Sequence, residues 1–170
     1  TFNQFDFKIE NNSQINFNIF SSTHTLHYST AYKMFKDKPI FGHGPKMFRE
    51  LCSTPKYGKG YYINKDNSKY WFNINCSTHP HNTYVQLLSE IGIIGIAPIL
   101  LIFLYCLIII IKKIFLNNFE ISNISFLCIT MIFSNLWPIM PSGNFFNNWL
   151  SIIYYLPVAI LFYENFKNKA

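Results

Sequence analysis

The sequence predicts a mainly α-helical, integral membrane segment in which a large polar loop at residues 1–80 precedes about three transmembrane helices in residues 81–170. Three observations support this class. Half of the 170 residues are hydrophobic and only 13% are charged. In a typical soluble domain about a quarter of the residues are charged. Residues 1–80 hold 10 Lys/Arg and 5 Asp/Glu, against 4 and 3 in the remainder. Uncharged runs of membrane length that are also predominantly apolar occur only in the second part.

The polar loop begins with two stretches in which apolar and polar residues alternate, at residues 5–9 and 15–19. The turn-forming stretch 11–13 separates them, which predicts a short β-hairpin. Over about residues 23–37 the apolar side chains recur at helical spacing. This pattern predicts an amphipathic helix on the membrane surface that ends before Pro39.

The remainder of the polar loop contains two further stretches. The stretch "PIFGHGPKMFREL" at residues 39–51 predicts a glycine-spaced turn that leads into a short helix. Residues 53–75 are rich in Tyr, Asn, Lys and Gly, and we expect an irregular loop there.

Three uncharged runs predict the membrane helices. Residues 92–111 form an uncharged run of 20 residues. As a helix this run spans about 30 Å, the thickness of the hydrocarbon core. We expect spans at about residues 83–111, 121–140 and 145–163, the second weakened by its polar residues and a proline. The alternative is a set of buried core helices in a soluble protein, for which the first run is too long and too apolar.

The lysines that flank these runs indicate the orientation, since cytoplasmic loops carry an excess of Lys and Arg. They are Lys112, Lys113, Lys167 and Lys169. Residues 1–80 and the short turn at 141–144 then lie on the opposite, oxidising side. A translocated first half requires an earlier membrane helix, so we expect this chain to be the C-terminal part of a larger protein.

Two cysteines, Cys52 and Cys76, lie 24 positions apart in the oxidising half, whereas Cys106 and Cys128 lie inside predicted spans. A disulfide between the first two would stabilise the loop by roughly 3–4 kcal/mol. The alternative is two free thiols.

The stretch "HPHN" at residues 79–82 directly precedes the first apolar run. Pro80 suits the first turn of a helix, with Ser77 or Thr78 as its cap. His81 then lies at the outer mouth of the helix, where a neutral imidazole can accept a proton from a hydroxyl. The alternative is an interfacial histidine without a catalytic role.

The stretch "HNTYVQLLSEIGIIG" at residues 81–95 contains His-Asn, nine residues, Gly, two residues and Gly. This spacing resembles the signature of the O-antigen ligase and O-antigen polymerase superfamily. The stretch "AYKMFKDKPIFGHGPKMFR" at residues 31–49 is similar to a second segment of that family, in which an amphipathic helix leads into a Gly-x-Gly turn. The resemblance implies that residues 1–80 are a periplasmic loop and that the protein is a multi-pass protein of the bacterial inner membrane.

The resemblance also implies a metal-independent glycosyltransferase without a cofactor. Its donor would be a glycan on undecaprenyl diphosphate. Its acceptor would be a sugar hydroxyl, on lipid A-core for a ligase or on a second lipid-linked glycan for a polymerase. The lipid bilayer is the other expected partner, and no nucleic acid is expected. The alternative function is a non-enzymatic membrane protein whose outer loop binds glycan or a partner.

Matched to the family pattern, His81 is the catalytic histidine and Asn82 supports it. Family members hold the diphosphate with loop arginines, because a guanidinium group suits that contact. Arg49 is the one arginine beside thirteen lysines, and we expect it to bind the diphosphate together with Lys46. Many members carry an arginine at the start of the loop helix, where this chain has His24 or His27, so His24 joins the predicted diphosphate site.

The supporting residues predicted from these motifs are Glu90, Gly42 and Gly44. A charge near lipid is costly, so we expect Glu90 to serve packing or to support the site indirectly. Gly92 and Gly95 are expected to permit close helix packing. A zinc site at Cys76, His79 and His81 is an alternative that their spacing disfavours, and no metal site is predicted.

Overall fold

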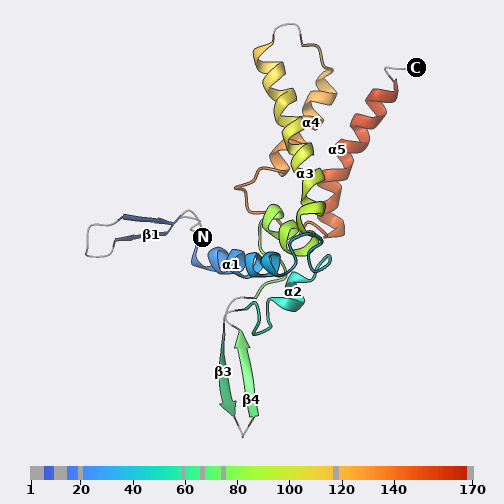
Figure 1. Ribbon diagram of the computed structural model, residues 1–170. Coiled ribbons are helices and arrows are strands. Elements are labelled where there is room, and N and C mark those ends of the chain that lie inside the picture. The colour runs from blue at the N-terminus through green and yellow to red at the C-terminus, as the bar shows by residue number, and fades with distance from the viewer. Residues whose placement is uncertain are drawn as a thin grey trace.

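The structure is a computed structural model of the 170-residue chain (Figure 1). It describes residues 6–9, 15–18, 21–58, 60–65, 68–73, 76–116 and 119–167. The described part is mainly helical, and its helices are α1 (Ser22–Asp37), α2 (Phe48–Leu51), α3 (Thr83–Phe115), α4 (Asn123–Asn135) and α5 (Asn148–Lys167).

Two antiparallel hairpins accompany the helices. In the first, β1 (Asp6–Ile9) pairs with β2 (Ile15–Asn18), which confirms the predicted hairpin, although its turn at 11–13 lies outside the described residues. In the second, β3 (Gly60–Lys65) pairs with β4 (Ser68–Asn73). The expectation of an irregular loop at 53–75 is therefore wrong. The sequence stretches "YYI" and "YWF" favour strands, and the many Asn and Lys residues around them obscured that signal.

Two helices, α3 and α5, are long and apolar enough to cross a membrane, with 33 and 20 residues. In the most apolar 18-residue window of each, only 11% and 6% of the residues are buried, which argues against core helices of a soluble protein. Apolar side chains that face outward include those of Leu101, Leu127 and Phe162.

The predicted second span at 121–140 is shorter than expected, because α4 covers only Asn123–Asn135. Its 13 residues extend about 20 Å. The helix ends before Pro138, as expected from the conformational restriction that a proline places on the residue before it. The third run forms α5, shifted from 145–163 to Asn148–Lys167.

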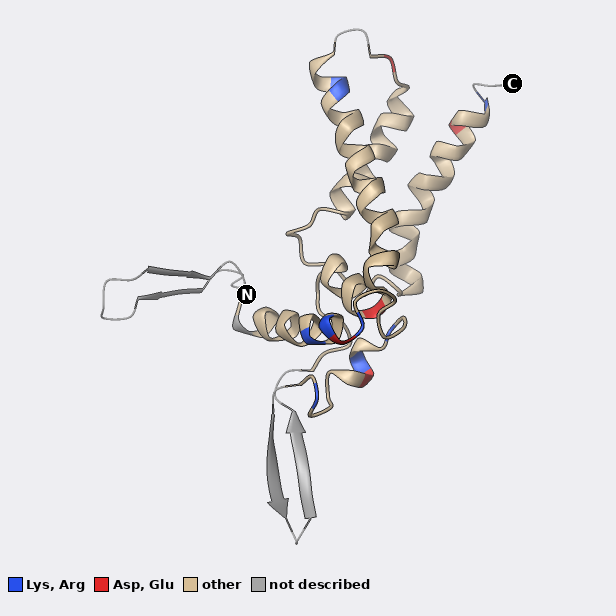
Figure 2. Cartoon of the chain, viewed as in Figure 1, with Lys and Arg blue, Asp and Glu red and all other residues tan. Residues whose placement is uncertain are grey.

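The three apolar helices pack together, with α4 against both α3 and α5, through a core that contains Cys106, Ile129, Ile132 and Leu136. Figure 2 shows the charged residues at the two ends of this α3–α5 bundle and along α1 and α2, with an uncharged stretch between. That distribution matches an apolar slab bounded by two polar layers.

A second core lies at one end of the bundle, where α1 crosses the N-terminal end of α3 (Figure 1). It contains Ala31, Met34, Phe48, Cys52 and Tyr57. Because α1, α2 and the start of α3 share this end, residues from both sequence motifs come together there.

Candidate functional site at the mouth of α3

The loop between α1 and α2 docks on a break in α3. Gly92 has φ 66° and ψ −165° and interrupts the helix, which leaves backbone groups on both sides of it without partners inside the helix. The loop satisfies four of them through the bonds His43 N to Ser89 O (3.3 Å), Gly44 N to Glu90 O (2.7 Å), Ile93 N to Pro39 O (2.9 Å) and Ile94 N to Ile40 O (3.2 Å). We call this contact the loop–helix joint.

Both glycine motifs serve this joint. Gly42 and Gly92 have positive φ, a conformation that glycine adopts without steric cost. A Cβ on Gly42 would overlap the backbone of Glu90, and one on Gly92 would overlap the carbonyl of Ile40. Gly92 therefore permits close packing of a loop, rather than of a second helix as the sequence predicted. Gly44 also has positive φ.

A chain of buried polar side chains continues from the joint. Glu90 is fully buried; its Oε1 accepts from the backbone N–H of Phe48 at 2.8 Å and its Oε2 from Nε2 of Gln86 at 2.9 Å. Gln86 also donates to Asn144 Oδ1 (2.9 Å) and accepts from the N–H of Phe145 (3.0 Å). These hydrogen bonds join α2, α3 and the loop between α4 and α5. A supporting role of Glu90 in the activity stays a prediction.

The N-terminal end of α3, which we call its mouth, differs from the prediction. Asn82 is the N-cap, with its Oδ1 accepting from Val85 N–H at 3.1 Å. His81 therefore precedes the helix instead of belonging to its first turn, and it takes a left-handed conformation with φ 59°. Ser142 N–H donates to the His81 carbonyl at 3.1 Å, and Asn82 Nδ2 donates to the Pro138 carbonyl at 2.7 Å. These contacts hold the α4–α5 loop against the site.

The prediction that Pro80 opens the helix, capped by Ser77 or Thr78, is also wrong. The helix begins at Thr83, because the Asn82 side chain caps it in an extended backbone conformation. Pro80 is buried before that point.

Four histidines gather at this mouth. The ring centroid of His81 lies 4.2 Å from that of His79, 5.6 Å from that of His24 and 5.7 Å from that of His27. Burial lowers the pKa of His81 below its ordinary 6.5, and the nearby charge of His24 lowers it further. His81 is therefore neutral at neutral pH and able to accept a proton.

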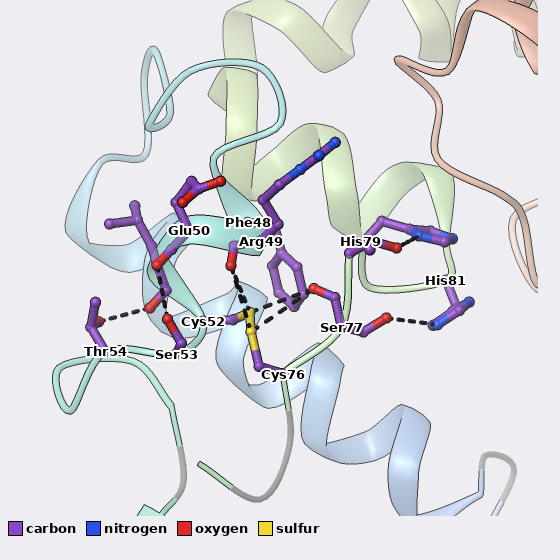
Figure 3. Close-up of a disulfide and its surroundings, with 12 residues drawn as sticks. Phe48, Arg49, Glu50, Cys52, Ser53, Thr54, Cys76, Ser77, His79 and His81 are labelled. Carbon is purple, nitrogen blue, oxygen red and sulfur yellow. Dashed lines mark hydrogen bonds between the residues drawn. A yellow bond between two sulfur atoms is a disulfide. The ribbon is translucent and has the colours of Figure 1, made fainter. Parts of the chain in front are cut away.

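His79 and His81 differ in their hydrogen bonds (Figure 3). His79 Nε2 lies 3.3 Å from the Ser142 carbonyl, and its Nδ1 lies 3.0 Å from Thr78 Oγ1. A carbonyl only accepts, so Nε2 of a neutral His79 carries the proton and Nδ1 accepts from the threonine hydroxyl. Burial and the charge of His81 lower the pKa of His79, while the bond to Ser142 raises it. Both nitrogens of His79 are thus occupied, whereas His81 bonds one side-chain oxygen, Ser77 Oγ, within the described part of the chain.

The predicted diphosphate residues are only partly brought together. His24 contacts the His81 ring, and His27, which the prediction left as the second choice, contacts it as well. Arg49 and Lys46 are exposed, and among the described residues neither shares a hydrogen bond or ion pair with His81. The Arg49 side chain extends from α2 away from the disulfide (Figure 3).

Cys52 and Cys76 form a disulfide with their Cα atoms 5.3 Å apart, which ties the end of α2 to the segment before the histidines. Cys106 and Cys128 are buried and free. With Cys76 in the disulfide, no thiolate remains beside His79 and His81 for zinc. Within the described ranges, no group of three His, Cys, Asp or Glu side chains is arranged to hold a metal ion.

These features define a helical membrane protein with a polar, histidine-bearing site at one end of its apolar helices. A family model described as O-antigen ligase matches residues 2–100, which is more than half of the 170 residues. The chain belongs to the O-antigen ligase family. No curated protein and no solved structure matches it.

Membership makes the chain a membrane protein of polysaccharide biosynthesis with glycosyltransferase-type activity on lipid-linked glycans. The matched residues contain the loop–helix joint and all four clustered histidines. Three site residues that sequence reasoning missed are Gln86, Ser142 and Asn144, and the last two lie beyond the match. A signal existed only for Gln86, an amide among apolar residues of a helix.

Proposed function

We propose that the protein moves a glycan from undecaprenyl diphosphate to a sugar hydroxyl, with His81 as the general base. The observation that carries this proposal is a half-buried, neutral imidazole at the mouth of an apolar helix in a member of the O-antigen ligase family. General-base assistance contributes typically 10²–10⁴-fold to a rate.

In the proposed step, the acceptor hydroxyl oxygen attacks the anomeric carbon of the donor glycan. The bond from that carbon to the diphosphate oxygen breaks, and undecaprenyl diphosphate leaves with the electron pair. His81 takes the proton of the hydroxyl and later releases it to water. The product is a new glycosidic bond, and the reaction needs no oxidant, metal or cofactor.

Positive charge beside the site suits the leaving diphosphate. His24 lies against His81, and Arg49 and Lys46 flank the start of α2. We propose that Arg49 and Lys46 reach the diphosphate when the donor is bound, and that His24 contacts it from α1. A guanidinium group can contact two phosphate oxygens at once.

We further propose that α3, α4 and α5 all cross the inner membrane, with α1 and α2 on the periplasmic side. The chain leaves α3 at Phe115 and returns through α4, whose following loop bonds the start of α3, for example Ser142 to His81. The path from one end of α3 back to the other supports a crossing by α4 despite its 13 residues. Labelling of Lys36→Cys and Lys113→Cys variants with an impermeant thiol reagent in intact cells tests the orientation, and labelling of the second would reverse it.

The experiment that tests the function uses native membranes containing the protein and a radiolabelled glycan on undecaprenyl diphosphate. We expect label to move to an acceptor glycan, with release of undecaprenyl diphosphate. Lipid A-core and a second lipid-linked glycan are supplied separately, and the one that becomes labelled distinguishes a ligase from a polymerase. Retention of the donor on the protein without transfer to either acceptor would instead support a glycan-binding protein.

A further inference from the structure

We propose that Ser77 is a positioning residue for His81: its hydroxyl oxygen accepts the Nε2–H of the imidazole and leaves Nδ1 to take the proton of the acceptor hydroxyl. This inference rests on the proposed function of His81. It adds a residue outside the family spacing motif and states which ring nitrogen acts.

The contact itself is direct. Ser77 Oγ lies 3.1 Å from His81 Nε2, within the range of a hydrogen bond. A neutral imidazole has one nitrogen that donates and one that accepts, and the partner of the first decides which nitrogen keeps its lone pair. Within the described residues Ser77 Oγ is the one side-chain atom that hydrogen-bonds His81. A serine hydroxyl can donate or accept, but both nitrogens of an imidazolium donate, so Ser77 Oγ accepts the Nε2–H once Nδ1 has taken the proton.

Both ends of this hydrogen bond are anchored. Ser77 directly follows Cys76, whose disulfide to Cys52 fixes the segment to the end of α2 (Figure 3). At the other end, Ser142 N–H holds the carbonyl of His81. With both backbones held, the hydroxyl sets the rotation of the ring rather than following it.

The hydrogen bond also favours the state that forms during transfer. When Nδ1 takes a proton, the ring becomes an imidazolium, and an Nε2–H from a charged group makes a stronger bond to Oγ. Within the part of the chain that the structure describes, the titratable side chains whose rings contact this ring are His24 and His27 on α1 and His79 in its own segment. All three disfavour a positive charge when they are protonated, so Ser77 is the neighbour that offsets them.

The test measures glycan transfer in native membranes as a function of pH for Ser77→Ala, Ser77→Thr and Ser53→Ala. Ser53 is a matched control, because it follows Cys52 as Ser77 follows Cys76, and its hydroxyl donates to the Glu50 carbonyl in an exposed position. We expect Ser77→Ala to lower turnover on the order of 10-fold to 100-fold, the effect of losing a hydrogen bond to a charged group. Ser77→Thr, which retains the hydroxyl, should restore most of it, and Ser53→Ala should transfer like the wild type.

The pH profile distinguishes positioning from a structural role. Loss of an acceptor for Nε2–H disfavours the imidazolium, so Ser77→Ala should move the acid limb of kcat/KM to lower pH. An acid limb that stays in place or moves to higher pH would overturn the proposal, as would wild-type turnover in Ser77→Ala. If those results appear while His81→Ala remains inactive, the Ser77 assignment fails alone; an active His81→Ala would remove the proposed function itself.

Discussion

The two ends of α3 are stabilised by different interactions. At its mouth, backbone hydrogen bonds close the loop–helix joint, and the buried side chains of Glu90, Gln86 and Asn144 form a hydrogen-bonded chain. Farther along, α3 packs on α4 and α5 through apolar side chains and leaves many others facing outward. The position of the site is therefore set by directional polar contacts, while the apolar helices support it through non-directional packing.

The difference explains where glycine is needed. A helix break exposes backbone groups that must find partners when buried, and here another backbone segment supplies them at a distance that excludes a Cβ. Within the described part of the apolar bundle, beyond the break at Gly92, no glycine has a positive φ. Substitutions at the mouth should therefore lower the free energy of unfolding much more than substitutions of similar size in the bundle.

The largest effect is expected for Gly92→Ala. The new Cβ would overlap the Ile40 carbonyl at a positive φ, so we expect a loss of stability on the order of 4 kcal/mol or more, which is reached only by specific structural damage. Thermal unfolding in membranes or detergent measures it. Leu101→Ala, at an outward-facing position of the same helix, is the control and should change little; equal losses in both variants would contradict the comparison.

Loss of the disulfide should have the next largest effect. Closing the loop from Cys52 to Cys76 stabilises by roughly 3–4 kcal/mol in the chain-entropy model, so the Cys52→Ser, Cys76→Ser pair should unfold more easily by about that amount. Mass spectrometry of unreduced peptides first checks that the bridge exists in cells. Alkylation of both cysteines without reductant would contradict it.

Breaking the buried polar chain should lower the free energy of unfolding by less than loss of the disulfide. Gln86→Leu leaves Glu90 Oε2 and the N–H of Phe145 without their present partner, and buried groups left unpaired cost about 1–3 kcal/mol each. We expect a loss of about 2–3 kcal/mol together with lower transfer activity. An unchanged unfolding temperature would mean that the mouth does not depend on this chain.

The smallest effect is expected at the exposed edge of the site. Arg49→Lys keeps the charge but loses the two-point contact of the guanidinium group, so the KM for the lipid-linked donor should rise several-fold, about the effect of one weakened hydrogen bond, with stability unchanged. Donor titrations of the transfer rate measure this change. An unchanged KM for the donor would mean that Arg49 does not bind the diphosphate.

Local patterns predicted the parts of this site that are local. The spacing from His81 to Gly92 and the Gly-x-Gly turn at 42–44 identified both sides of the joint, and helical periodicity located α1. That the two motifs contact each other does not follow from either pattern. The buried amide of Gln86 reaches Asn144, which is 58 positions away, and no periodicity in the sequence records such a pairing.

Two errors have physical causes of the same kind. His81 was expected inside the first helical turn because Pro80 suits that position, but capping by Asn82 competes and moves the helix start two residues beyond His81. The second span was expected from an uncharged run, whereas its helix is shortened before Pro138. In both cases hydrophobicity indicated the region, and a nearby polar or proline residue decided where the helix begins or ends.

The most direct test of the central claim compares His81→Ala with His79→Ala for glycan transfer from the undecaprenyl diphosphate donor, with protein abundance measured beside it. Loss of a general base predicts that His81→Ala reduces turnover by about 10²–10⁴-fold at normal abundance. His79→Ala should be milder, because both of its nitrogens already bond Ser142 and Thr78. Near-normal transfer by His81→Ala would contradict the account.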